Sequence, residues 1–228
     1  MKSRAIVTRW RARLRIRKAL LLAARKRHEA NPTAVTRAAL ERRKRQVEYA
    51  ERVIRRHTGR TPKIVNLRLS IQNKFGTLGA IKWVTGHHTA GPKDKSDSHA
   101  EALFTSFNVA HAAKGWGGIG YHFGLARSGT LYLLRPVGLK GAHVGAHNTG
   151  NIGIVCNGTT GDHPTVEQAE TLQWLLENAH TSAMPVSHRT PTSLKNAQVR
   201  GHNDWMGHES NSCPGTHKTM YLSRGERW

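Results

Sequence analysis

Positive charge is distributed very unevenly along this chain of 228 residues. Residues 1–75 contain 23 of the 36 Lys and Arg residues but only four acidic residues, which gives them a net charge of +19. Residues 76–228 have a net charge of only +3 and contain 13 of the 15 histidines. A strongly charged stretch with few apolar residues buries little core of its own. We therefore expect a basic appendage followed by a domain of ordinary size.

The appendage is predicted to form two helices. The first covers residues 3–28 and is broken at Pro32, because the residue before a proline is pushed out of helical geometry. The second covers residues 33–57, where three apolar residues recur every seven positions: Leu40, Val47 and Ile54. This apolar stripe is thin, so it predicts a helical hairpin and no independent core.

Turn-forming residues at positions 58–62 predict a linker. The chain is thus expected to divide into a basic helical arm, residues 1–60, and a second domain, residues 64–228. Three interpretations of the arm stay open: it binds an anionic cell-wall polymer or membrane surface, it binds nucleic acid, or it only keeps the protein soluble. Nucleic acid is the least favoured, since the arm has few aromatic residues to stack on bases.

No export signal is expected. The apolar run from Ala19 to Ala24 is too short for the core of a signal peptide and is followed by more Lys and Arg. No run approaches the length of a membrane span. The two cysteines, Cys156 and Cys213, do not make a disulfide framework. These features predict a chain that stays in the cytoplasm where it is made.

Strand and helix signals alternate after residue 63. Strands are predicted around residues 67–71, 81–85, 121–126, 130–134 and 152–156. One helix is expected to begin at a capping box formed by Ser98 and Glu101, and another at a capping box formed by Thr165 and Gln168. We expect an α/β fold in which a central mixed β-sheet is flanked by helices, preceded by the basic helical arm.

Two adjacent histidines, His87 and His88, follow the predicted strand at 81–85. Side chains alternate along a strand, so only one of the pair can point into a shared site. A histidine at the end of a strand is well placed to act as a metal ligand or a catalytic base. His202 and Cys213 lie far along the chain, and two histidines with one cysteine are a typical catalytic zinc set. Spacing alone indicates zinc only weakly, because such triplets arise by accident in any histidine-rich chain, and the alternative is two structural histidines and an inert buried thiol.

Six short motifs, in order, narrow these alternatives: HHTA, GYHF, GAH, NIGI, GHND and CPG, between Ile81 and Gly215. The set resembles the type 2 N-acetylmuramoyl-L-alanine amidases, zinc-dependent cell-wall hydrolases that include phage lysozymes and the peptidoglycan recognition proteins. Six motifs together are far more specific than any one of them. The first third of the chain lies outside the resemblance.

The resemblance implies a role for each matching residue. One zinc ion would be bound by His87, His202 and Cys213. Tyr121 matches the catalytic tyrosine, whose hydroxyl would donate to the developing oxyanion. His143 matches a histidine of the substrate groove, and we also assign His88 to substrate binding although it faces the other way.

One position departs from the family pattern. Catalytic members often carry Lys or Thr two residues before the cysteine, where this chain has Asn211. We keep Asn211 among the expected catalytic residues, but an amide cannot deliver a proton. Another group must then protonate the leaving amine, and His143 and Lys218 are the two candidates.

The expected function is hydrolysis of the lactyl amide between N-acetylmuramic acid and the L-Ala of peptidoglycan. The enzyme would be a monomeric phage endolysin that waits in the host cytoplasm until the membrane is breached. The alternative is a peptidoglycan receptor of the same fold without catalysis, a branch that loss of a zinc ligand usually marks.

Overall fold

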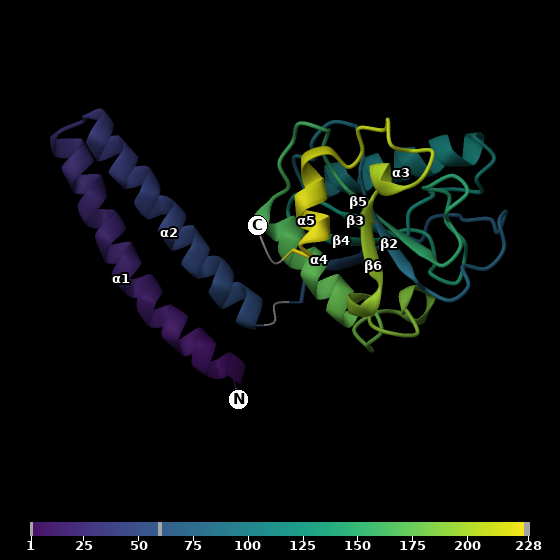
Figure 1. Cartoon of the computed structure of the whole chain (residues 1–228), viewed down its shortest axis with the longest axis horizontal. Helices are drawn as coiled ribbons and strands as arrows, with labels where there is room; N and C mark the ends of the chain where they lie inside the picture. The colour runs from purple at the N-terminus through teal and green to yellow at the C-terminus, as the bar shows by residue number, and fades with distance from the viewer. Residues whose placement is uncertain (1, 59–60, 226–228) are drawn as a thin grey trace. The chain divides into compact units, whose positions relative to one another are not determined.

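The structure is a computed structural model that describes residues 2–58 and 61–225. The chain divides into two compact units, residues 1–60 and residues 61–228 (Figure 1). Within the described ranges, no helix combines the length and the apolar character needed to cross a bilayer.

The first unit is a hairpin of two long helices, α1 (Lys2–Ala30) and α2 (Ala34–Thr58) (Figure 1). The predicted helices are therefore present, and the chain turns at the Asn-Pro pair as expected. Thr33 stabilises the start of α2, since its Oγ1 accepts a hydrogen bond of 3.2 Å from the Thr36 amide. Small or apolar residues close the seam between the helices, where Ala24, Val47 and Ala50 are buried.

A six-stranded mixed sheet is the centre of the second unit, with the strand order β1-β4-β3-β5-β2-β6. All neighbouring strands are parallel except the hairpin pair β3 and β4. The strands are β1 (Ile64–Asn66), β2 (Trp83–His88), β3 (Phe123–Leu125), β4 (Leu131–Leu133), β5 (Asn151–Cys156) and β6 (Gln198–Gly201). The mixed α/β fold expected from the sequence is confirmed.

Helices cover both faces of this sheet (Figure 1). They are α3 (Asp97–Ala113), α4 (Val166–Asn178) and α5 (Lys218–Leu222). The alternation of β5 shows the two layers: Ile152, Ile154 and Cys156 pack in the core with α4 and α5, whereas Val155 packs in the core with α3. Because the sheet is buried on both faces, all six residues of β5 are buried.

Two predictions of secondary structure are wrong: one strand and one helix cap. The strand expected at residues 67–71 is absent, and β1 ends at Asn66, because Asn66 Oδ1 accepts a hydrogen bond of 2.9 Å from the Arg68 amide and Arg68 has a φ of 48°. Helix α3 is capped by Ser96, whose side chain accepts from the His99 amide, so the expected cap at Ser98 is two residues late. The capping box of Thr165 and Gln168 is present as predicted.

Candidate active site

The site forms where parallel strands β2 and β6 end side by side. Gly86 of β2 lies opposite Gly201, the last residue of β6, so the residues that follow them, His87 and His202, emerge together at the carboxyl edge of the sheet. The centres of their rings are 4.7 Å apart. Carboxyl ends of parallel strands commonly carry the functional residues of α/β folds.

Gly86 allows the close packing that fixes His87. A Cβ atom at this position would lie 2.2 Å from the ring of Tyr221, so no larger residue fits. The Tyr221 hydroxyl lies 2.9 Å from the carbonyl oxygen of His87 and 3.1 Å from that of Ile154. Through Tyr221, helix α5 thereby holds the end of β2 in place.

Cys213 completes the cluster from a loop. The nitrogen and sulfur atoms of His87, His202 and Cys213 that can bind a metal all lie within 4.8 Å of one another. Cys213 Sγ is 3.7 Å from His87 Nδ1 and accepts a hydrogen bond of 3.3 Å from the His88 amide. The structure thus brings together the three residues that the sequence marked as zinc ligands.

Hydrogen bonds determine which nitrogen of His87 is free for a metal. His143 Nε2 lies 3.1 Å from the carbonyl oxygen of Asn151, and a carbonyl only accepts, so this nitrogen carries the proton. In a neutral ring the Nδ1 of His143 is then an acceptor, and it lies 3.1 Å from His87 Nε2. His87 therefore donates from Nε2, and its unprotonated Nδ1 faces the Cys213 sulfur at 3.7 Å.

His202 is held by the same arrangement. His208 Nε2 donates to the carbonyl oxygen of Gly145 at 3.2 Å, and His208 Nδ1 accepts from His202 Nε2 at 3.2 Å. The Nδ1 of His202 is left unprotonated. Metal-binding histidines usually donate their second ring N–H to an acceptor that orients the ring. Here each acceptor is a second histidine that is itself anchored on a backbone carbonyl.

Burial sets the protonation of the cluster. It holds the pKa of His87 well below its ordinary value and lowers the pKa of His202 to about 4 and that of His143 to about 3. These rings are neutral at pH 7. Burial also raises the pKa of the Cys213 thiol to about 12, so the thiolate needs a cation beside it. Two neutral imidazoles and a thiolate are a donor set that fits zinc.

Tyr121 lies beside the cluster, with its ring centre 5.0 Å from that of His87. Burial, with a smaller effect from Cys213, raises the pKa of Tyr121, so the hydroxyl keeps its proton. The segment before it is fixed by the fully buried Arg135, which donates to the carbonyl oxygens of Trp116 at 2.8 Å and Ile119 at 2.8 Å.

His88 lies on the opposite face of the sheet. It is opposite Cys156 in the register, its ring stacks against His217 with centres 6.2 Å apart, and only 4% of it is exposed. The alternation expected for the two histidines is therefore observed. The substrate-binding role that we assigned to His88 does not fit this position, because the ring is buried away from the cluster.

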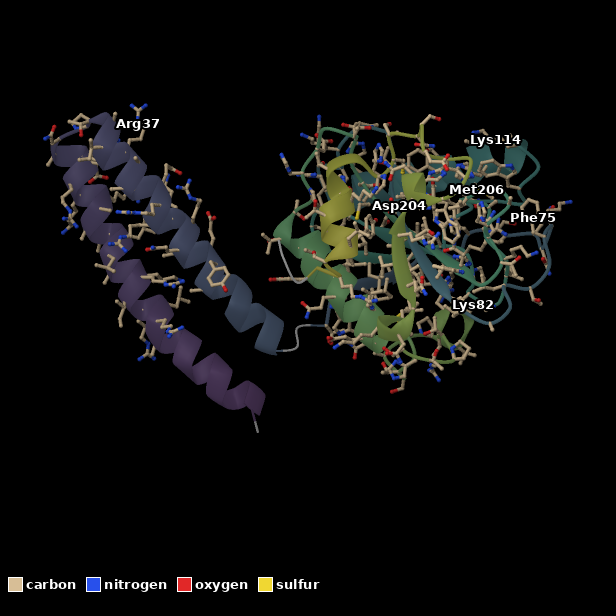
Figure 2. The ribbon with its side chains drawn as sticks, in the orientation of Figure 1. Arg37, Phe75, Lys82, Lys114, Asp204 and Met206 are labelled. Carbon is tan, nitrogen blue, oxygen red and sulfur yellow. The ribbon has the colours of Figure 1, made fainter. Side chains whose placement is uncertain are left out.

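Asn211 and Lys218 are both engaged in local contacts. Asn211 Oδ1 accepts a hydrogen bond of 2.8 Å from the Cys213 amide, so the side chain shapes the loop that carries the cysteine. Lys218 Nζ donates to Asn203 at 3.0 Å and pairs with Asp204 at 2.5 Å. Figure 2 labels Asp204 and Met206, which lie in the segment that follows β6. In this structure both Asn211 and Lys218 serve the architecture of the site.

His208 is the residue that the sequence did not reveal. It lies in the irregular loop between His202 and Cys213, where no periodicity relates it to either residue. Its position depends on a long-range contact with Gly145.

Comparisons with known proteins agree with this geometry. The model of the family described as N-acetylmuramoyl-L-alanine amidase matches residues 77–216. A search of curated proteins gave no match. The solved structures of similar fold include the endolysin amidase LysCS from Clostridium intestinale, with 23% identity and a TM-score of 0.52 over 69% of this chain and 90% of that chain.

Two further structures are peptidoglycan recognition proteins. Drosophila PGRP-LB has 20% identity and a TM-score of 0.55 over 71% of this chain and 91% of its own. PGRP-LE, solved in complex with tracheal cytotoxin, a monomeric peptidoglycan, has 22% identity and a TM-score of 0.55 over 70% and 92% of the two chains. At such identities the likeness shows the fold alone.

Proposed function

Because this chain belongs to the N-acetylmuramoyl-L-alanine amidase family, we propose that it hydrolyses the lactyl amide bond between N-acetylmuramic acid and L-Ala in bacterial peptidoglycan. One zinc ion per chain, held by His87, His202 and Cys213, would serve this reaction. The observation that carries the proposal is the cluster itself, whose ligand atoms lie within 4.8 Å of one another.

When bound, zinc supplies an activated water molecule and polarises the scissile carbonyl group. Side chains of the protein orient the zinc ligands and stabilise the developing charge. His143 and His208 keep the Nδ1 atoms of His87 and His202 unprotonated and correctly directed. The Tyr121 hydroxyl, which stays protonated, donates a hydrogen bond to the carbonyl oxygen as negative charge develops there. In this account Asn211 positions Cys213 and transfers no proton.

We assign this activity to a phage endolysin that acts as a monomer on the cell wall after release from the host cytoplasm. An endolysin amidase among the structures of similar fold supports the assignment. The net charge of +22 is a further support, since bacterial walls and membranes are anionic.

A second candidate is a peptidoglycan receptor without catalysis. The complex of PGRP-LE with a peptidoglycan fragment shows that this fold also serves recognition. An intact ligand set with oriented Nδ1 atoms favours the enzyme, because a receptor does not need it.

To test this, zinc-loaded protein is incubated with purified peptidoglycan, and the soluble products are identified by mass spectrometry. We expect free stem peptides that begin with L-Ala. Cys213→Ser should bind the wall and release none. Wall binding by the unaltered protein without any release of peptide would establish the receptor and refute the amidase.

A further inference from the structure

The two broad faces of the helical arm differ in their side chains. Ile16 and Leu20 on α1 are 63% and 37% exposed, and a spacing of four residues puts them on one face of the helix. At about 100° per residue, Arg27 lies between them in projection. Val35 on α2 is 78% exposed. This face therefore places a short strip of exposed apolar side chains beside arginine.

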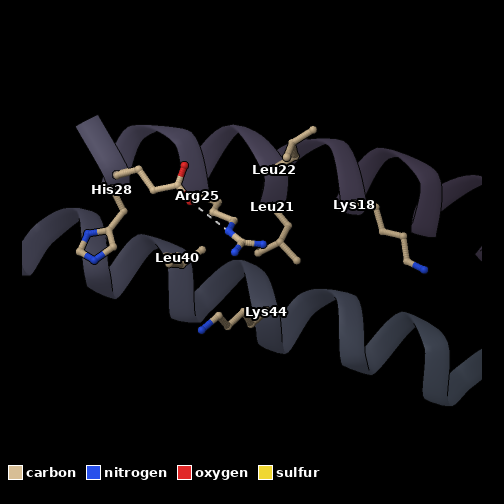
Figure 3. Close-up of a pocket in the computed structure, with 8 residues that line it drawn as sticks. Lys18, Leu21, Leu22, Arg25, His28, Leu40 and Lys44 are labelled. Atoms are coloured by element: carbon tan, nitrogen blue, oxygen red, sulfur yellow. Dashed lines mark hydrogen bonds and ion pairs between the residues drawn. The ribbon is translucent and has the colours of Figure 1, made fainter. Parts of the chain in front are cut away.

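The opposite face of the arm contains a groove of about 550 Å³ between the two helices (Figure 3). It is lined by Lys18, Leu21, Leu22, Arg25, His28, Glu29, Leu40 and Lys44. Arg25 pairs with Glu29 at 3.1 Å, and Lys44 pairs with Glu41 at 2.7 Å.

Helical periodicity separates the two faces. Ile16 and Leu20 lie roughly 180° from Lys18 and Arg25 around α1. Val35 lies a similar angle from Lys44 around α2, so it falls on the side away from the groove. The acidic residues Glu29 and Glu41 therefore mark the groove side. Among the described side chains, the side with Ile16, Leu20 and Val35 carries no acidic residue.

We propose that the face formed by Ile16, Leu20 and Val35 docks on an anionic phospholipid bilayer. The three apolar side chains enter the boundary between headgroups and acyl chains, and the surrounding arginines bind lipid phosphates. Residues 1–60 contain 20 Lys and Arg and four Glu, and the first acidic residue is Glu29. That charge complements an anionic surface and opposes association with a second copy of the arm.

Exposed apolar side chains distinguish a bilayer from a dissolved polyanion. A nucleic acid or a wall polymer is attracted by charge alone and gains nothing from Ile16 or Leu20. Removing these two side chains should therefore weaken binding to lipid and leave binding to a soluble polyanion unchanged.

The test measures co-sedimentation of the full-length protein with vesicles. One set contains phosphatidylglycerol and phosphatidylcholine, and the other contains phosphatidylcholine only. We expect binding to the anionic set and a loss of about tenfold or more in affinity for the variant with both Ile16→Ser and Leu20→Ser. Leu22→Ser is the matched control, because Leu22 is 56% exposed on the groove side. It should stay within about twofold of the unaltered protein.

The proposal would be overturned by equal binding to the two vesicle sets, by equal losses in the double variant and in Leu22→Ser, or by unchanged vesicle binding by the double variant. A duplex oligonucleotide serves as the soluble polyanion. If the double variant loses duplex binding as strongly as vesicle binding, the face is not specific for lipid. Circular dichroism checks the helices, and Val35→Ser tests the same face by a single substitution on α2.

Discussion

Tyr121 is the side chain whose removal isolates one chemical contribution. Its ring lies 5.0 Å from His87 between ring centres, and its hydroxyl remains protonated. Loss of a single donor to a developing oxyanion typically costs about 2.7–4 kcal/mol of transition-state stabilisation. We expect Tyr121→Phe to lower kcat by a factor of about 10²–10³ while the zinc content stays the same. An unchanged kcat, measured on purified peptidoglycan, would remove Tyr121 from the mechanism.

His208 supports a metal ligand without being one. It accepts a hydrogen bond of 3.2 Å from His202, and loss of such a partner typically lowers metal affinity by about 10–100-fold. We expect this loss for His208→Ala in a zinc competition titration against a chromophoric chelator. His147→Ala is the control, because His147 lies nearby against Trp205 and its Nε2 contacts the Met206 carbonyl. Equal affinities for the two variants would contradict the supporting role of His208.

At the scale of elements, the close packing of β2 against α5 makes Gly86 a point of stability. A methyl group there would meet the Tyr221 ring at 2.2 Å. We expect Gly86→Ala to lower the free energy of unfolding by about 1–3 kcal/mol, the usual cost of overpacking. Gly161→Ala is the control, since a Cβ there meets no atom within 4 Å. Urea denaturation followed by tryptophan fluorescence measures both, and equal stabilities would show that α5 yields to the new methyl group.

Elements with local signals could be predicted from the sequence. The hairpin of β3 and β4, strand β5 and the capping box of α4 depend on neighbouring residues and were all predicted. Strand β6 and helix α5 were missed, since β6 is defined by its pairing with β2 and α5 by its burial against the sheet.

The same division applies to the site. The family motifs pointed to His87, His202 and Cys213, which the structure brings together. The supporting contacts of His143 and His208 could not be predicted, because each depends on a carbonyl oxygen that the fold brings from another segment. For His88, the sequence did predict the position, because alternation along β2 puts its side chain on the opposite face from His87. The substrate-binding role assigned to His88 was inconsistent with that position.

For the whole molecule, the two units should act independently. Every residue of the candidate active site lies in residues 61–228, whereas the proposed lipid-binding face lies in residues 1–60. We therefore expect Cys213→Ser to bind anionic vesicles as the unaltered protein does. The variant with Ile16→Ser and Leu20→Ser should retain its kcat on soluble peptidoglycan fragments. Measuring both activities on both variants checks this, and a change in both activities from either substitution would refute independence.

In the proposed function, one zinc ion at His87, His202 and Cys213 serves amide hydrolysis. The most direct measurement titrates zinc into chelator-stripped protein and records the release of new L-Ala amino termini from purified peptidoglycan. We predict that activity is absent in the stripped protein and reaches its maximum at one zinc per chain, and that Cys213→Ser stays inactive throughout. Full activity in the stripped protein, or full activity of Cys213→Ser, would contradict zinc-dependent hydrolysis at this cluster.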